Sequence, residues 1–586
     1  MSCFGAALSG AALLLNRENQ VETAKGRRKR GRGLPFTLSL IFLVSLVFVP
    51  LVQSEENVVI DIARLAGGDA DLQTETLKAL AERSDPATLP LLHALHEGSL
   101  YRWSAAGSLR VVRIEMVESP DGEKKGILVD PLTGKKVGEG DGTEEGFEMI
   151  SVGSAEGRRW LSAALRRIKL FDPSPEVRRS AATQIGNGTD LLSLLPLSRA
   201  LEQEADAWAR HAMEGAIGQL QLSDPDPQVR KEAAKRLGAI HSQEGLPKLK
   251  ALLSEEPVEA DPAVRAEIAS ATVRIERYQV WEQFAGTLFS GISLGSILLL
   301  MGLGLAITFG LMGVINMAHG EMMMIGAYTT FALQEFFTAH LPPAYHDFYF
   351  IAALPLSFLV AGGVGWLLEK GVIRFLYGKP LETLLATWGI SMILQQAARW
   401  YFGDLTSVNA PNWIRGGVQA TVGLVLPYNR IFIILLSVAG LVGIHLLLSR
   451  TRYGLKIRAV TQNRDMSACL GISTRRVDGW TFALGAGLAG LAGCALSLVG
   501  NVDPEMGKTY IVDSFMVVVV GGVGKLAGTI VSALGIGMLN KILEPMIGGT
   551  GGAIYAKLFI LAAIILFLQR KPSGLFPAKG RAAESS

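Results

Sequence analysis

The pattern of apolar and polar positions changes near residue 283. Before it, residues 55–280 alternate between charged and apolar positions, as a water-soluble domain does. After it, residues 283–570 form about nine apolar, glycine-rich segments separated by short polar loops. Because a helix needs about 20 apolar residues to cross a bilayer, these segments predict a polytopic helical membrane domain. They are 283–310, 320–338, 350–376, 382–402, 429–449, 477–500, 509–521, 526–545 and 551–569.

A polar stretch, residues 316–321, interrupts the apolar pattern between the first two segments. An unpaired polar group in lipid is costly, so such a stretch must be packed in protein or line a water-filled path. Asn316, His319 and Glu321 are therefore candidates for a substrate path. The alternative is a helix end whose side chains cap neighbouring backbone groups.

A second polar stretch lies in the fourth segment, where Thr387 and Trp388 are followed by Gln395 and Gln396. An aromatic ring with nearby hydroxyl and amide groups could shape a path for a small polar solute. Thr387 and Trp388 are thus further candidates for the substrate path. The tryptophan could instead serve packing or lie at the membrane interface.

The loop after the fifth segment, residues 450–476, contains seven basic residues and one acidic residue. Its alternating apolar and charged positions predict a short amphipathic helix that docks into a groove on a partner protein. The alternative is a solvated loop that only sets the topology. The residues assigned to coupling with an ATPase are Arg452, Gly454, Arg458, Ala459, Asn463 and Gly471.

Basic residues occur in alternate loops: after the third segment, after the fifth, and in the tail, residues 571–586. The positive-inside rule places these loops in the cytoplasm and residues 55–280 outside. Residues 1–54 support this orientation, because a basic run precedes a short apolar core, as in a secretory signal peptide that directs export of the following domain. An uncleaved membrane anchor is the alternative. A multi-pass protein of a bacterial inner membrane with a periplasmic N-terminal domain is expected.

Residues 55–280 contain a recurring phrase, Asp-Pro followed by Val-Arg and small residues, at 172–182, 224–234 and 261–269. Aspartate is expected to cap each helix and proline to occupy its first turn. The pattern resembles HEAT repeats. A polar segment at 115–150 reads as an inserted loop that contains a hairpin. The predicted fold class is all-α, a helical membrane permease preceded by an exported HEAT-like domain.

The sequence contains no recognisable metal-binding, nucleotide-binding or catalytic motif. The three cysteines are far apart and the eight histidines lack metal-ligand spacing, so no metal site is expected. The chain has neither a GxxxxGK[ST] phosphate loop nor a nucleophile–base set. An enzyme is therefore not expected, nor are catalytic residues or a cofactor. The net charge of +3 gives no reason to expect nucleic acid.

Four motifs together resemble the permeases of the branched-chain amino acid ABC importers, the LivH/LivM type. The resemblance covers about residues 283–577. Met317 replaces the phenylalanine of the usual NFAHG form. Within the family, the chain is most similar to permeases that carry urea, because of its N-terminal extension and the Thr387–Gln396 region. The motifs lie at 316–328, 452–472, 521–528 and 571–576.

The resemblance implies a second permease subunit, cytoplasmic subunits that bind and use ATP, an exported solute-binding protein and contact with membrane lipid. The first hypothesis is translocation of urea. Branched-chain amino acids or short amides are the alternative for the same machine. A channel or secondary carrier with a fused exported domain is the alternative from another class.

Overall fold

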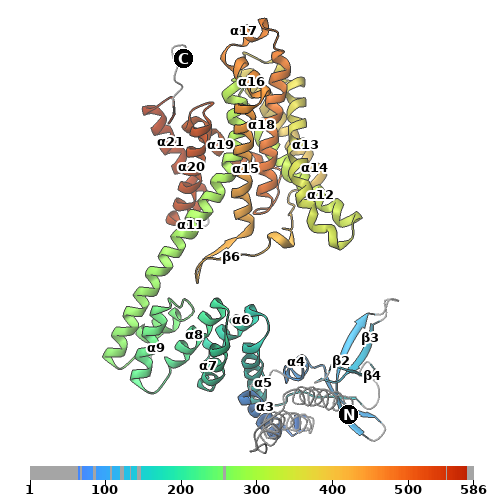
Figure 1. Ribbon diagram of the computed structural model, residues 1–586, viewed down its shortest axis with the longest axis vertical. Helices are drawn as coiled ribbons and strands as arrows, with labels where there is room; N and C mark the ends of the chain where they lie inside the picture. The colour runs from blue at the N-terminus through green and yellow to red at the C-terminus, as the bar shows by residue number, and fades with distance from the viewer. Residues whose placement is uncertain are drawn as a thin grey trace, which may run out of the picture. The chain divides into compact units, whose positions relative to one another are not determined.

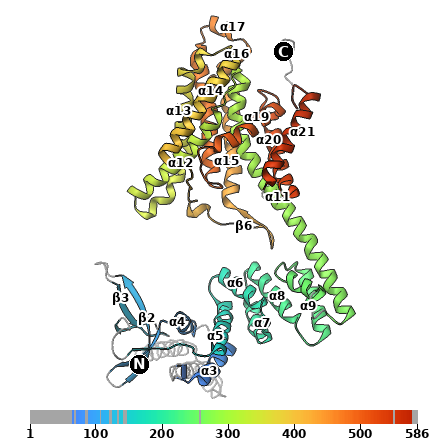
Figure 2. The same ribbon diagram turned by 180° about the vertical axis from the view of Figure 1, so that it is seen from behind.

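The computed structural model describes residues 64–65, 69–83, 88–105, 108–118, 124–131, 134–140, 147–254, 259–548 and 551–576. The expected signal segment, residues 1–54, lies outside the described residues. The chain consists of two compact units, Met1–Ala233 and Ala234–Ser586 (Figures 1 and 2). Each unit is described by itself below.

The first unit combines helices with one antiparallel sheet of strand order β4-β3-β2-β1-β5. The all-α expectation is wrong for residues 100–149, which hold all five strands. Strand β2 is rich in valine and isoleucine, residue types that favour strands, and its Val112 is buried. The strands are β1 (Leu100–Ala105), β2 (Ser108–Glu118), β3 (Lys124–Val129), β4 (Lys136–Glu139) and β5 (Phe147–Met149).

The helices of the first unit enclose two apolar clusters. One contains Leu77, Leu91 and Leu161, and the other contains Leu197 and Met213. HEAT-type stacking of these helices stays a prediction. The helices are α3 (Ala70–Arg83), α4 (Leu89–Glu97), α5 (Ala155–Ile168), α6 (Pro175–Gly186), α7 (Leu194–Gln203), α8 (Ala207–Gln221) and α9 (Pro227–Ala239), which continues into the second unit.

The recurring Asp-Pro…Val-Arg phrase builds helix starts. In the third copy Asp261 caps α11 as predicted, by accepting the backbone N–H groups of Ala263 and Val264, whereas the first copy differs. In the first copy Asp172 does not cap α6; it accepts the backbone N–H of Ser174 in the preceding turn at 2.8 Å. Arg178 folds back and donates to the carbonyl oxygens of Asp172 and Pro173. Arg230 repeats this contact in the second copy. The arginine therefore satisfies loop carbonyls that would otherwise lack partners.

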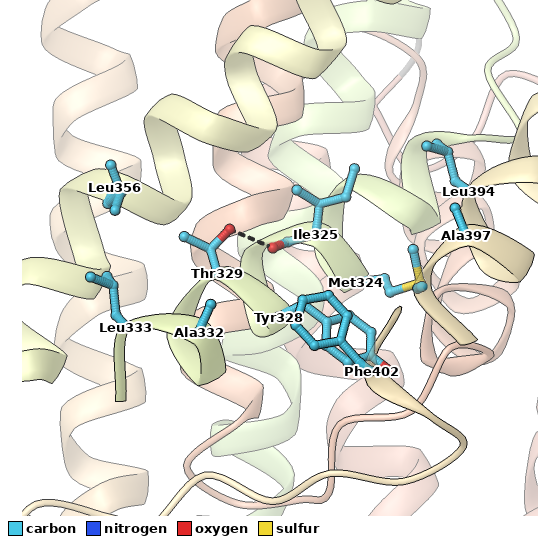
Figure 3. A pocket seen from close by; sticks show the side chains of 11 residues that line it. Met324, Ile325, Tyr328, Thr329, Ala332, Leu333, Leu356, Leu394, Ala397 and Phe402 are labelled. Atoms are coloured by element: carbon cyan, nitrogen blue, oxygen red, sulfur yellow. Dashed lines mark hydrogen bonds between the residues drawn. The ribbon is translucent and has the colours of Figure 1, made fainter. Parts of the chain in front are cut away.

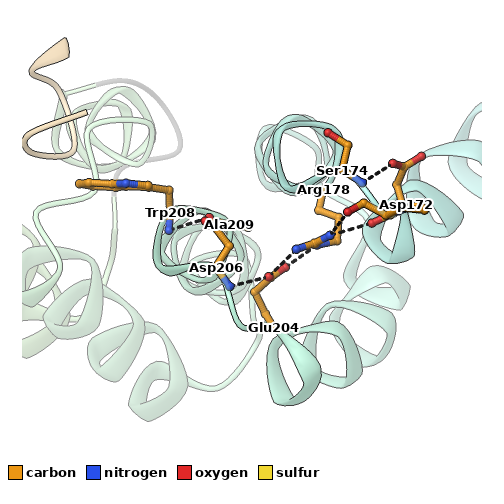
Figure 4. A network of polar contacts seen from close by, with 8 residues as sticks. Asp172, Ser174, Arg178, Glu204, Asp206, Trp208 and Ala209 are labelled. Atoms are coloured by element: carbon orange, nitrogen blue, oxygen red, sulfur yellow. Dashed lines mark hydrogen bonds and ion pairs between the residues drawn. The ribbon is translucent and has the colours of Figure 1, made fainter. Parts of the chain in front are cut away.

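Arg178 also links two successive helices of the first unit (Figure 4). Its guanidinium donates to both carboxylate oxygens of Glu204, each at 2.7 Å. Glu204 also accepts the backbone N–H of Asp206, which caps α8 through Trp208 and Ala209. The side chain of Glu204 is 1% exposed. The hydrogen bonds from Arg178 lower the pKa of Glu204 below its ordinary value.

This pair gives a prediction about pH. The folded-state pKa of Glu204 is depressed, so its stabilisation is present above the unfolded pKa, about 4.3, and is lost as pH falls through the folded pKa. Glu204→Gln should cost about 2 kcal/mol at pH 7, and the difference from the wild type should shrink below about pH 4. Guanidinium unfolding of the full chain, followed by pulse proteolysis of this unit, measures it. The exposed Glu202→Gln is the control; equal losses in both variants would contradict the prediction.

The second unit contains helices at all nine predicted apolar segments. Its first long helix, α11 (Pro262–Met312), is continuous through residues 280–283, where the composition changes. The others are α10 (Leu246–Ser254), α12 (His319–His340), α13 (Tyr349–Gly371), α14 (Pro380–Phe402), α15 (Tyr428–Arg450), α16 (Arg452–Gln462), α17 (Arg464–Cys469), α18 (Thr474–Leu496), α19 (Met506–Gly521), α20 (Leu526–Ile547) and α21 (Gly552–Arg570). A hairpin, β6 (Gly417–Gln419) and β7 (Val425–Pro427), precedes α15.

Six helical stretches of the described chain are long and apolar enough to cross a membrane. Helices α12 and α14 are outside this set, as is α19, which has 16 residues. In α12 and α14 the polar side chains discussed below lower the hydropathy. The six stretches are Pro262–Gly310, Pro343–Phe375, Tyr428–Arg450, Thr474–Leu496, Leu526–Ile547 and Gly552–Arg570.

Helix α18 lies in the middle of this bundle and packs on α12 and α13 at backbone distance (Figures 1 and 2). A Cβ on Gly326 of α12 would collide with the backbone of Gly490, and one on Gly493 would collide with the Met323 carbonyl. Small residues at such contacts allow helices in lipid to approach closely. The spacing of glycines in α18 therefore fixes the separation of these helices.

We expect Gly326→Ala to destabilise the membrane domain by about 2 kcal/mol, because the added methyl group has no space against Gly490. Thermal unfolding of the purified full chain in detergent measures this loss. The control is Gly363→Ala on α13, where a Cβ meets nothing within 4 Å. Equal melting temperatures for the two variants would show that the α12–α18 contact is looser than described.

Candidate functional site

Helix α12 begins inside the helix bundle. After α11 ends, the chain turns back at Gly313, whose φ of 66° suits glycine. The imidazole Nε2 of His319 then lies 3.2 Å from the carbonyl oxygen of Met301. Met301 is about three turns, or roughly 16 Å, before the end of α11. The polar stretch predicted from the sequence is therefore packed between helices, and His319 and Glu321 are buried.

The carboxylate of Glu321 is the centre of a buried polar cluster. Its Oε1 accepts hydrogen bonds from the Ser391 hydroxyl at 2.8 Å and from the Gln395 amide at 2.7 Å. The amide of Gln395 also donates to Ser391 at 3.1 Å. Glu321 is 1% exposed, and its second oxygen, Oε2, has no hydrogen-bond partner among the described residues. The cluster thus presents an open acceptor inside the bundle.

Asn316 and Thr387 lie on the chain that leads into this cluster. Asn316 Oδ1 accepts the backbone N–H of Ala318 at 3.0 Å, in the turn that precedes α12. Thr387 accepts the backbone N–H of Met317 at 3.1 Å and so ties α14 to the polar stretch. Within the described residues, Asn316 Nδ2 and His319 Nδ1 are buried without partners. Four of the five residues predicted to line the path are therefore buried near one another: Asn316, His319, Glu321 and Thr387.

Trp388 is the exception, because it is 52% exposed on another face of α14. Ser391 and Gln395, which the sequence analysis did not assign to the path, occupy the buried face. Thr383, Thr387, Ser391 and Gln395 are all buried and recur every four residues, so they share one helix face. That spacing is the signal in the sequence that could have identified them.

An apolar cavity of about 470 Å³ lies between α12, α13 and α14 (Figure 3). Tyr328 and Phe402 stack in its wall with ring centroids 4.4 Å apart. The Tyr328 hydroxyl is buried without a partner among the described residues. The lining residues are Met324, Ile325, Tyr328, Thr329, Ala332, Leu333, Leu356, Leu394, Ala397, Ala398 and Phe402.

The predicted docking segment forms two short helices, α16 and α17, at the end of the bundle opposite the β6–β7 hairpin (Figure 1). Asn463 caps α17 by accepting the Met466 backbone N–H at 2.9 Å. Gly471 ends the segment with φ 83°. Gly454 is buried where α16 meets the end of α15, Ala459 is half-buried, and Arg452 and Arg458 are exposed.

Three large apolar side chains of this segment are exposed: Leu455, Met466 and Leu470, the last at 75%. Ile457 and Val460, on the other face of α16, pack against Val477 of α18. The segment therefore has one face anchored on the bundle and one apolar face left open between basic residues.

Residues 287–568 match the family model described as branched-chain amino acid transport system / permease component. BraD, a high-affinity branched-chain amino acid transport system permease protein of Pseudomonas aeruginosa, is 29% identical over 294 residues, 49% of this chain and 94% of BraD. The permease LivH of Salmonella typhimurium is 27% identical over 300 residues, 50% of this chain and 95% of LivH. LivM of Escherichia coli is 27% identical over 308 residues, 49% of this chain and 69% of LivM.

No solved structure matches the chain. Among the described residues, no group of histidine, cysteine and acidic side chains is placed to hold a metal ion. The matched region begins within α11 and ends within α21, so it coincides with the helix bundle that contains the Glu321 cluster and the α16–α17 segment. Residues 287–568, the membrane half of this chain, are thus similar to the family of branched-chain amino acid transport permease components.

Proposed function

We propose that the chain is a permease subunit of an ATP-driven importer and that it translocates urea. The observation that carries the proposal is the buried cluster of Glu321, Ser391 and Gln395. Urea is uncharged and planar, with N–H donors on both nitrogens and one carbonyl oxygen. The open Oε2 of Glu321 supplies an acceptor for such a solute, and Asn316 Nδ2, which is also buried without a partner among the described residues, supplies a donor. The groups around Glu321 that supply hydrogen bonds are neutral, which suits a neutral solute.

A branched-chain amino acid is the second candidate, and a specific observation favours it. The apolar cavity between α12, α13 and α14 is lined by aliphatic and aromatic side chains and could receive a branched side chain. The related proteins named above are branched-chain amino acid permeases. A zwitterion would also need a cationic partner for its carboxylate, which the cluster's hydrogen-bond partners do not provide.

The partners follow from the same proposal. The positive-inside rule places α16 and α17 in the cytoplasm, where their exposed apolar face would dock into a groove on an ATP-binding subunit. A second permease subunit would complete the path, and an exported solute-binding protein would deliver the solute. The N-terminal unit would then lie outside the inner membrane. ATP would be used by the partner subunits.

Uptake of labelled urea and labelled leucine, by cells with and without this chain, tests the substrate. Gln395→Leu should lower urea uptake about tenfold or more, because it removes a buried hydrogen bond to a charged group. Gln396→Leu is the matched control, since Gln396 is exposed on the neighbouring face of α14. If cells without the chain lose only leucine uptake, the substrate is a branched-chain amino acid and not urea. Uptake of both solutes without the chain would contradict the proposal.

Copurification with the ATP-binding subunit tests the docking face. Leu470→Asp should lower the affinity about tenfold or more, because a charge replaces an apolar side chain that is buried on docking. Leu470→Met keeps size and polarity and should bind as the wild type does. Undiminished binding of the aspartate variant would show that the ATPase contacts another surface.

A further inference from the structure

We infer that Arg464 and Asp478 form a joint through which the α16–α17 segment moves α18, so that Arg464 is a positioning residue for transport. The inference rests on the proposed function, in which that segment docks on an ATPase. Arg464 is the first residue of α17, and Asp478 lies in the first turns of α18. Their side chains form an ion pair.

Three successive residues of α18 contact the α16–α17 segment. The Tyr453 hydroxyl lies 3.5 Å from the carbonyl oxygen of Arg476. Val477 packs in the apolar cluster that α16 forms with Ile457 and Val460. Asp478 binds Arg464 of α17. Both short helices thus contact α18 at the same turn. A displacement of either helix would therefore displace the first turns of α18.

The ion pair is the contact that α17 cannot release at low cost. Asp478 is 3% exposed, and a buried carboxylate without a cationic partner is strongly destabilising. The guanidinium of Arg464 also lies over the Tyr377 ring, 4.8 Å from its centroid. A neighbouring buried carboxylate, Glu369 of α13, has its own partner in Arg374 at 3.4 Å. Both arginines act electrostatically on both carboxylates, but the direct ion pair of Asp478 is with Arg464, and this contact links α17 to α18.

Helix α18 then contacts α12, which carries Glu321. The α12–α18 contact is made by the backbones of Gly326 and Gly490 and by Gly493 against Met323. Close-packed interfaces of this kind have no slack to absorb a displacement. A shift of the first turns of α18 is therefore passed to α12 and to the polar cluster at its start. The ion pair would convert docking-segment movement into opening or closing of the path.

The test uses the complete transporter in proteoliposomes and measures solute imported per ATP hydrolysed, with labelled urea and labelled leucine as the two probes. Arg464→Gln and Asp478→Asn should each leave the complex assembled and hydrolysing ATP, while the ratio falls about tenfold or more. The double variant should be no worse than either single one, because the two side chains act as a pair. Arg464→Lys keeps the charge and should retain most of the ratio.

The control is Arg475→Gln, an exposed arginine three residues before Asp478, which should keep the wild-type ratio. A wild-type ratio in both single variants would overturn the inference. Loss of assembly and of hydrolysis in both would also overturn it, since the pair would then hold the fold and not transmit movement. A wild-type chain that fails to bind the ATPase would instead contradict the proposed function.

Discussion

Backbone-to-backbone packing of α18 on its neighbours is the constraint on which the membrane unit depends. Lipid tails give no hydrophobic drive for helix association, so close van der Waals contact must hold the bundle together. Gly326, Gly490 and Gly493 allow that contact because any side chain there would collide with a facing backbone. The same packing gives α12 a fixed place in the bundle, and with it the buried start of α12.

The start of α12 explains why polar side chains are tolerated at this depth. The chain turns back after α11 and begins α12 beside Met301, among other helices and away from lipid. Ser391 and Gln395 then satisfy one oxygen of Glu321, and Thr387 ties the polar stretch to α14. Glu321 Oε2, Asn316 Nδ2 and His319 Nδ1 are left without hydrogen-bond partners among the described residues.

At the end of the bundle that carries α16 and α17, ion pairs link neighbouring elements where close packing does so elsewhere. Asp478 and Glu369 are buried near the first turns of α18 and the last turn of α13, and each is paired with its own arginine. Ion pairs of this kind have a steep cost when broken, whereas the apolar contacts of α16 give way gradually. The docking segment is thereby attached to the rigid core without being part of it.

The amino-acid sequence by itself determined where the helices of the membrane unit lie, because long apolar runs have few alternatives to helices in lipid. It also located the polar interruption at residues 316–321 and the basic segment at 450–476. It did not reveal the sheet at residues 100–149. The charged residues of β2 occur at irregular spacing, so its sequence does not distinguish a strand from a loop; its pairing with β1 and β3 makes it a strand.

Only the tertiary structure decided which face of each helix points inward. Thr387 and Trp388 are adjacent in the sequence, yet one is buried against the polar stretch and the other is exposed. Successive residues of a helix differ by about 100° in direction, so the two side chains point to different faces. The four-residue spacing of the polar side chains marks one face of α14 in the sequence, but it does not say whether that face turns toward other helices. That face is set by the helices it meets: the N–H of Met317 and the carboxylate of Glu321 select Thr387, Ser391 and Gln395.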